Sequence, residues 1–149
     1  MGTHQFSLSG SWLGGMAGRG ELQAGQLRFE TSAPEPLGGA GIGTNPEEML
    51  LGSAASCYLI TLASMLEHRK WSIKKLTIRS EGRVTMSGRL TFESIVHRPE
   101  IHTSSPLSDM DREQLTALAL RAEQVCMITR AIAGNVAMRV EPVIVEAAE

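Results

Sequence analysis

The longest apolar stretch of the chain, residues 44–71, predicts one long helix. Asn45 is a preferred N-cap residue, and Pro46 suits the first helical position, where its missing N–H costs nothing. Glu48 lies three residues after Asn45 and can complete a capping box. Between the two ends almost every residue is apolar or small, and a helix without a polar face is buried on most of its sides. We therefore expect this helix at the centre of the protein.

Small residues interrupt this helix around its first cysteine. Gly52, Ser53 and Ser56 make the apolar run too discontinuous for a membrane span and allow other backbones to come close. Cys57 follows them directly. A buried thiol is usually inert packing, so the stretch by itself favours a structural cysteine over a reactive one.

Alternating apolar and polar residues predict strands between residues 3 and 31. Phe6 and Leu8 alternate in the first strand, and Leu27 and Phe29 alternate after a turn at residues 24–25. A glycine-rich segment lies between them at residues 14–20. Residues 32–43 are rich in Gly and Pro and predict a loop that leads into the long helix.

After the long helix, the pattern predicts an antiparallel hairpin that turns at residues 87–88 and ends near two histidines. His97 and His102 flank a proline near the end of this hairpin, and we expect them to be exposed loop residues. They have no nearby cysteine partner, so we expect no metal site there.

A second helix is predicted from Ser108, a good N-cap with Asp111 three residues later, to about Val125. Cys126 and a short helical piece follow. Residues 136–145 predict a final strand, which Pro142 makes an edge or bulged strand.

The order strands, long helix, strands, helix, strand predicts an α+β fold in a single domain over residues 1–149. The sheet of one small chain can hardly cover so long an apolar helix. A dimer that wraps the helix between two sheets would cover it.

Composition narrows the function classes. The chain has 149 residues, a net charge of −2 and 4% aromatic residues, which argues against nucleic acid or an anionic membrane as partner. The N-terminus has no positive segment followed by an apolar run, so we expect a cytoplasmic, reducing location. Two cysteines in that setting are more often free thiols or a redox pair than a structural disulfide. We expect no cofactor: Glu47 and Glu48 place negative charge where a phosphate on the helix N-terminus would lie.

Two motifs resemble the OsmC/Ohr family, the osmotically inducible and organic hydroperoxide resistance proteins. The first is NPEE at residues 45–48 with Cys57 ten residues after Glu47. The second is AEQVCMITR at residues 122–130, followed by AIAGNV. The order of strands and helices is also similar, so the resemblance covers nearly the whole chain.

The resemblance implies an OsmC-like fold with antiparallel sheets around a long central helix, in an intertwined homodimer. It also implies a thiol peroxidase that acts on a small hydroperoxide and is recycled by a dithiol reductant, without nucleic acid or membrane. Cys57 would be the peroxidatic thiol and Cys126 the resolving thiol. Glu47 matches the glutamate that orients an arginine beside the thiolate.

The expected arginine is where this sequence departs from the family. Members often place it directly after a Gly-Gly pair, but Met16 follows Gly14 and Gly15 here. Arg19, in the glycine-rich segment, is the best substitute, and Arg28 is next, although it suits a solvent-facing strand position. Cys57 is too deep in its helix for that helix's dipole to activate it, so a cation is expected to do so.

Two interpretations remain open at this stage. The paired cysteines favour a cysteine peroxidase. The missing arginine after Gly15 favours an OsmC-like binding or stress-associated protein without efficient peroxidase activity.

Overall fold

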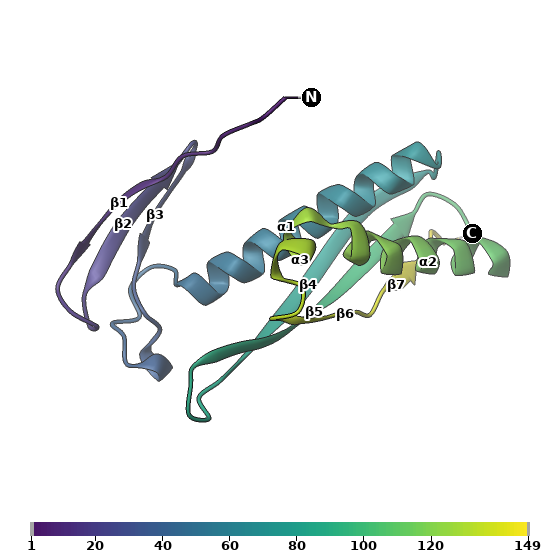
Figure 1. Ribbon diagram of the computed structural model, residues 1–149. Coiled ribbons are helices and arrows are strands. Elements are labelled where there is room, and N and C mark those ends of the chain that lie inside the picture. Colours follow the sequence, from purple (N-terminus) through teal and green to yellow (C-terminus); the bar gives the residue numbers. More distant parts are fainter. Residues whose placement is uncertain (1, 149) are drawn as a thin grey trace. The chain divides into compact units, whose positions relative to one another are not determined.

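The computed structural model describes residues 2–148 and divides the chain into two compact units, Met1–Leu50 and Leu51–Glu149 (Figure 1). The helices are η1 (Glu35–Leu37), α1 (Pro46–His68), α2 (Asp109–Val125) and α3 (Met127–Ile132). The strands are β1 (Ser9–Leu13), β2 (Arg19–Ala24), β3 (Leu27–Thr31), β4 (Ile73–Thr85), β5 (Thr91–Thr103), β6 (Ala137–Val140) and β7 (Val143–Val145). The α+β composition expected from the sequence is confirmed.

The first unit contains an antiparallel sheet of three strands in the order β1-β2-β3. Cross-strand partners share a face, so its register separates polar from apolar side chains. One face carries charged residues: Arg19, Glu21, Arg28 and Glu30. The opposite face carries apolar residues: Trp12, Leu22, Leu27 and Phe29. We call the second set the apolar face of the first sheet.

The predicted N-cap of α1 is confirmed, whereas the Glu48 carboxylate bonds to Thr44 instead of closing the predicted capping box. Asn45 accepts a hydrogen bond from the backbone N–H of Glu48 at 2.8 Å, and the helix begins at Pro46. The Glu48 carboxylate accepts from the hydroxyl of Thr44 at 2.9 Å. The helix therefore starts where the sequence indicates because its free N–H groups find a partner.

The second unit has a four-stranded sheet in which β4 and β5 form the expected antiparallel hairpin and β6 and β7 both pair with β5 in parallel. The predicted final strand is split in two at Glu141 and Pro142. Pro99 lies opposite that break, because β6 pairs with residues 94–97 and β7 with residues 100–102. A proline is tolerated in this central strand where the pairing on one side is already interrupted.

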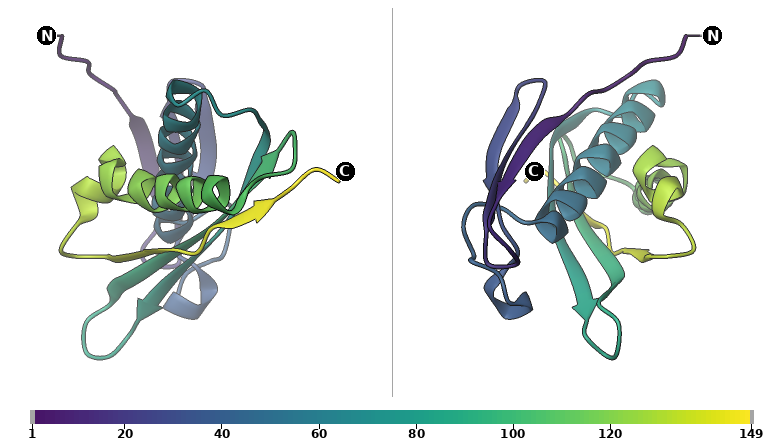
Figure 2. Two further views of the ribbon diagram at one scale, coloured as in Figure 1. Left: turned by 90° about the vertical axis from the view of Figure 1, so that its right-hand side faces the viewer. Right: turned by 60° about the vertical axis from the view of Figure 1, so that its left-hand side comes forward.

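Helices α1 and α2 cross each other (Figure 2) and share a hydrophobic core with this sheet. The core between them contains Tyr58, Leu62 and Leu66 of α1, Ile101 of β5, and Leu115, Leu118, Ala119 and Ala122 of α2. The four α2 residues are spaced three or four positions apart, or are adjacent, and so form one apolar face of the helix. The hydroxyl of Tyr58 donates to the carbonyl of Ala119 at 2.8 Å, which satisfies a buried polar group inside the core.

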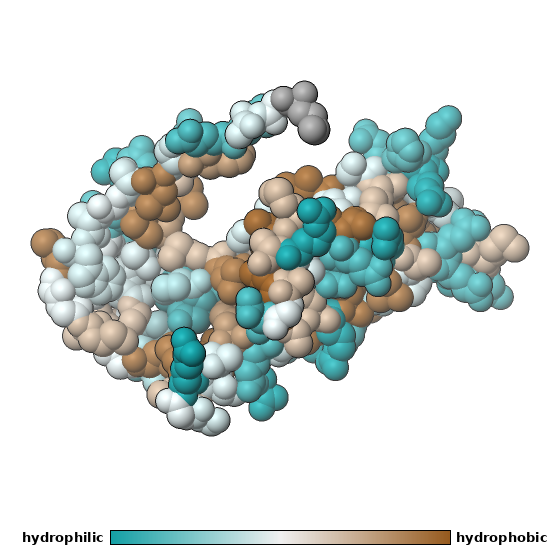
Figure 3. All heavy atoms as spheres, in the orientation of Figure 1, coloured by the Kyte–Doolittle hydropathy of each residue, from teal (hydrophilic) through white to brown (hydrophobic). Residues whose placement is uncertain are grey.

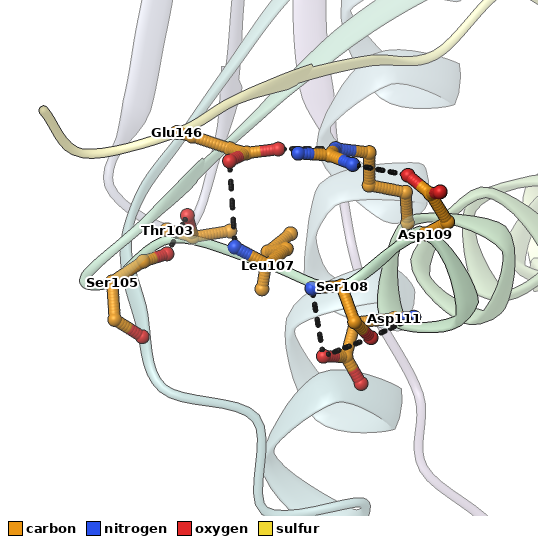
Figure 4. Close-up of polar contacts among 8 residues, drawn as sticks. Thr103, Ser105, Leu107, Ser108, Asp109, Asp111 and Glu146 are labelled. Atoms are coloured by element: carbon orange, nitrogen blue, oxygen red, sulfur yellow. Dashed lines mark hydrogen bonds and ion pairs between the residues drawn. The ribbon is translucent and has the colours of Figure 1, made fainter. Parts of the chain in front are cut away.

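The N-terminus of α2 is held by a polar network (Figure 4). Ser108 accepts from the N–H of Asp111 at 3.1 Å, and the Asp111 carboxylate accepts from the N–H of Ser108 at 3.2 Å. This is the predicted capping box. Arg112 pairs with Glu146, just after β7, and this contact lowers the pKa of Glu146. The start of α2 is thus tied to the C-terminal segment.

Within the described chain, α1 is less covered than its composition predicts. Only Ala54, Tyr58, Leu62 and Leu66 are buried. The opposite side is exposed and consists of Gly52, Ser53, Ser56, Ile60, Ala63, Ser64 and Glu67, which we call the outer face of α1. Apolar residues reach the surface over both units in Figure 3. The expectation that α1 is buried on most sides is therefore wrong for the single chain.

By length and composition alone, α1 could cross a membrane: its most apolar 18-residue window has a mean hydropathy of 1.7 and is 22% buried. Core helices of soluble proteins share these properties. Tyr58, Leu62 and Leu66 of α1 pack against the sheet and α2, which is the behaviour of a core helix.

The prediction that His97 is an exposed loop residue is wrong. Strand β5 continues past Pro99 to Thr103, and this alternation turns His97 into the core and His102 onto the opposite face. His97 is fully buried, its ring lies 5.2 Å from that of Tyr58, and its Nδ1 lies 2.6 Å from the hydroxyl of Ser80. Burial lowers the pKa of His97, since the charged imidazolium is costly in this core.

The buried His97 should make the folded protein less stable in mild acid. Its pKa is lower in the folded than in the unfolded chain, so the unfolded chain binds more protons and stability falls as the pH drops below about 6.5. Urea unfolding at a series of pH values should show a steeper loss for the wild type than for His97→Gln. His68→Gln, at the exposed end of α1, is the matched control and should follow the wild type. Equal slopes for the wild type and His97→Gln would contradict the assignment.

Candidate functional site

The second unit brings Cys57 and Cys126 together. Cys57 is half-buried in the middle of α1, while Cys126 is fully buried at the junction between α2 and α3. Both are free thiols. The Cys126 thiol and the Cys57 thiol are hydrogen-bonded to each other, and this contact lowers the pKa of Cys57 and raises the pKa of Cys126. The pair predicted from two distant motifs is therefore a contact in the fold.

The surroundings of Cys57 favour its thiolate. Burial raises its pKa, but hydrogen bonding to the Cys126 thiol and to the backbone N–H groups of Ile128 and Met127 outweighs burial, so the net pKa is lowered. A thiolate is the nucleophilic form of cysteine. Cys57 is therefore the better nucleophile of the two.

Cys126 has the complementary environment. Burial raises its pKa, and the neighbouring Cys57, which takes the negative charge, raises it further. Cys126 therefore stays protonated and donates to Cys57. The asymmetry follows from position: Cys126 is fully buried, whereas Cys57 is reached by donors from a second helix.

The junction between α2 and α3 supplies those donors. The N–H of Cys126 closes α2 by donating to Ala122 at 3.0 Å, and the carbonyl of Cys126 opens α3 by accepting from Arg130 at 3.0 Å. The first N–H groups of a helix have no partner inside it. In α3 these include the N–H groups of Met127 and Ile128, which contact Cys57.

This activation was missed in the sequence analysis, where a cation was expected to be necessary. The dipole of α1 does not reach Cys57, which lies too far from the N-terminus of that helix. The signal was the short helix after Cys126, whose first turn must leave free N–H groups. Which group they face depends on how α3 packs against α1, and the sequence pattern does not give that.

Thr61 lies one turn after Cys57 on α1. Its hydroxyl donates to the Cys57 carbonyl at 2.8 Å and also contributes to the lowered pKa of the Cys57 thiol. A threonine that bonds back to the preceding turn is common in helices. Here it adds a polar side chain to an otherwise apolar stretch at the reactive cysteine.

Glu47 lies in the first turn of α1, in the first unit. Its Oε2 atom is buried and has no hydrogen-bond partner among the described residues. An unpaired buried carboxylate oxygen is costly and calls for a donor. Helix α1 is continuous from Pro46 to His68, so ten residues of helix, about 15 Å of rise, separate Glu47 from Cys57.

Arg19 is the first residue of β2 rather than part of a loop, and it pairs with Leu13 of β1. It is exposed on the charged face of the first sheet, which it shares with Arg28. The structure thus places Cys57 and Cys126 together in the second unit, and Glu47 and Arg19 in the first. Among the described residues, no group of three or more His, Cys, Asp or Glu side chains could hold a metal ion.

The family model described as OsmC-like protein matches residues 38–141, which include both cysteines. The chain belongs to the OsmC-like family. Its two motifs, which carry the resemblance in the sequence, both fall inside the matched range.

Relatives of this OsmC-like protein include chains with and without a named activity. It is 41% identical over 142 residues to the uncharacterized protein YmaD of Bacillus subtilis strain 168, covering 95% of each chain. It is 26% identical over 132 residues to an organic hydroperoxide resistance protein of Xanthomonas axonopodis pv. citri, covering 83% of this chain and 84% of that protein.

A solved structure confirms the OsmC-like fold. The organic hydroperoxide resistance protein OhrB of Bacillus subtilis has a TM-score of 0.65 at 25% identity, covering 92% of this chain and 98% of that chain. The names of these two relatives connect them with resistance to organic hydroperoxides.

The contact between the two thiols predicts a dependence of Cys57 on the donor at position 126. In Cys126→Ala and Cys126→Ser, Cys57 is the only thiol, and thiolate absorbance near 240 nm against pH reports it alone. The pKa of Cys57 should be higher in Cys126→Ala, which lacks a donor, than in Cys126→Ser, which keeps an O–H. Identical titrations of the two variants would show that residue 126 donates nothing to Cys57.

Proposed function

We propose that this OsmC-like protein is a thiol-dependent peroxidase that reduces organic hydroperoxides. The observation that carries the proposal is the pair of adjacent thiols with opposite roles. Cys57 is half-buried with a lowered pKa, and Cys126 is buried with a raised pKa. The relatives named organic hydroperoxide resistance proteins support a hydroperoxide as the substrate class.

The proposed reaction needs no cofactor. The Cys57 thiolate attacks the distal oxygen of the hydroperoxide, the O–O bond breaks, and the alcohol leaves after taking up a proton. Cys57 is then a sulfenic acid. The Cys126 thiolate attacks that sulfur, an S–S bond forms, and the sulfenic oxygen leaves as water after protonation. A dithiol reductant returns both cysteines to thiols and is itself oxidised to a disulfide.

The roles of the two cysteines predict different failures. Cys57→Ser should abolish peroxide reduction. Cys126→Ser should still form a sulfenic acid at Cys57 but turn over poorly with dithiols, because the disulfide cannot form. Peroxide consumption and trapping of the sulfenic acid with dimedone, read by mass spectrometry, measure the two steps. If both variants lose the first oxidation equally, the assignment of roles is wrong.

Glu47 and Arg19 are proposed to complete the site. A guanidinium would satisfy the unpaired buried oxygen of Glu47. Because about 15 Å of α1 separates Glu47 from Cys57, the same guanidinium would add positive charge near a thiolate only where a dimer brings Cys57 of the second copy to it. Arg19 is the candidate because it is the arginine nearest in sequence to the Gly14–Gly15 pair. This role also requires the two units to act together as one OsmC-like domain.

Replacing Arg19 tests this role directly. Arg19→Met should raise the pKa of Cys57 and lower kcat/KM for hydroperoxide by about tenfold or more, because a close opposite charge moves a pKa by one to three units. Arg28→Met, on the same face of the first sheet, is the matched control and should leave both unchanged. The rate of alkylation of Cys57 against pH gives the pKa. An unchanged profile in Arg19→Met would remove Arg19 from the site.

A homodimer is proposed from the apolar surface that each unit leaves open. Trp12 and Leu27 on the apolar face of the first sheet are 47% and 58% exposed, and Ile60 on the outer face of α1 is 68% exposed. A sheet of three strands needs its apolar face covered to be stable. A groove of about 710 Å³ beside the outer face of α1, lined partly by Ile60 and Trp71, gives a second copy a surface to bind.

Placing a charge on the outer face of α1 should break this dimer. Light scattering at micromolar concentration should give a dimer for the wild type and a smaller mass for Ile60→Lys, because a lysine cannot be buried there without a partner. Leu120→Lys, at an exposed apolar site on α2, is the control and should remain dimeric. A folded wild-type monomer at this concentration would contradict the proposal.

The proposed setting is the cytoplasm, where reductants keep both cysteines as thiols between turnovers. The second candidate function is an OsmC-like binding or stress-associated protein without efficient peroxidase activity. The observation that favours it is Met16 at the position after Gly14 and Gly15, together with the exposed location of Arg19. The peroxide-consumption assay with a dithiol separates the two.

A further inference from the structure

Thr129 occupies a special position at the second cysteine. Cys126 is the N-cap of α3 and Thr129 lies three residues later, at the position whose side chain reaches back toward the N-cap residue in a capping box. Thr129 is only 5% exposed. A capping-box side chain would normally bond to the N-cap N–H, but the N–H of Cys126 already donates to Ala122.

The hydroxyl of Thr129 therefore cannot form the usual capping-box hydrogen bond. Its Oγ1 atom is buried and makes no well-formed hydrogen bond to any described residue. Burying a hydroxyl without a hydrogen-bond partner costs free energy, so an unpaired buried hydroxyl often has a functional role. The group that it faces is the Cys126 thiol: both the backbone N–H and the hydroxyl of Thr129 lie close enough to lower the pKa that burial and Cys57 raise.

The proposed reaction requires a hydrogen-bond donor at Cys126, and the Thr129 hydroxyl can be that donor. In the resting site Cys126 is the donor and Cys57 holds the negative charge. After the first oxidation Cys57 is a neutral sulfenic acid, and Cys126 must lose its proton in a fully buried position. A buried thiolate without donors is strongly disfavoured. The donors that stabilised Cys57, the N–H groups of Met127 and Ile128, are directed at the other sulfur.

Resting on the peroxidase function proposed above, we propose that Thr129 is the activating residue for Cys126 in the resolving step. Its hydroxyl donates to the Cys126 thiolate while this sulfur attacks the Cys57 sulfenic sulfur, forming the S–S bond and breaking the S–O bond. The thiol proton of Cys126 passes to solvent, and the hydroxyl that leaves the Cys57 sulfur takes up one proton from solvent and departs as water, so the step releases no net proton. Thr129 itself exchanges no electrons and keeps its proton.

Two substitutions separate this role from simple packing. Thr129→Val keeps the branched shape and removes the hydroxyl. Thr129→Ser keeps the hydroxyl and removes a methyl group. A packing role predicts that serine is the worse replacement, while an activating role predicts that serine restores what valine loses.

The first experiment requires no peroxide. In full-length Cys57→Ser, Cys126 is the only thiol, and its thiolate absorbance near 240 nm can be followed against pH. Burial raises the pKa of Tyr58, the single tyrosine, so its ionisation lies well above the ordinary range. Adding Thr129→Val should shift the titration of Cys126 to higher pH, and adding Thr129→Ser should leave it near that of the parent.

The second experiment follows one turnover of the otherwise wild-type protein with one equivalent of cumene hydroperoxide. Sulfenic acid trapped by dimedone and disulfide formed are both quantified by mass spectrometry. In Thr129→Val the first oxidation should proceed at the wild-type rate. Closure of the disulfide should be about tenfold slower, as expected for loss of one hydrogen bond to a charged group, with its pH dependence displaced to higher pH.

Failure of this proposal and failure of the proposed function give different results. If the wild type forms neither sulfenic acid nor disulfide, the peroxidase function is wrong, whatever the titration shows. If sulfenic acid forms but Thr129→Val closes the disulfide at the wild-type rate, Thr129 has no activating role. An unshifted Cys126 titration in Thr129→Val, or a serine variant as slow as the valine variant, would also overturn the proposal.

Discussion

The contact between Cys57 and Cys126 is the interaction on which the proposed chemistry of this protein depends. Helix α1 alone could not activate a thiol in its middle, because its free N–H groups lie in its first turn. Helix α3 solves this by presenting its first turn, and the residue that caps it is itself a cysteine. One short junction therefore supplies a second thiol and two backbone donors to the same sulfur.

The rest of the second unit keeps that junction in place. Helix α2 is held at its start by the Ser108 capping box and by Arg112, along its length by the core with α1, and near its end by the Tyr58 hydroxyl on Ala119. Cys126 follows its last residue. The parallel strands β6 and β7 then return the chain to β5, which encloses α2 and α3 in one crossover.

The helix caps could be predicted from the sequence. Asn45, Ser108 and Asp111 cap helices where predicted because a cap depends on residues only a few positions away. His97 was misplaced because its burial depends on β5 continuing past Pro99, which is possible only where β6 and β7 leave a gap. The partnership of the cysteines came from the family resemblance, and the donors of α3 came only from the packed structure.

In the proposed peroxidase cycle, the difference in access between the two sulfurs would fix a direction for the reductive half. Cys126 is fully buried and Cys57 is only half-buried. In a disulfide between them, an incoming thiol meets the Cys57 sulfur first, so the mixed disulfide forms there and Cys126 is the leaving group. The donors around Cys126 thus also govern how readily the bridge is opened. In the proposed cycle the reductant therefore has to reach the Cys57 sulfur on α1 rather than the buried Cys126 sulfur at the end of α2.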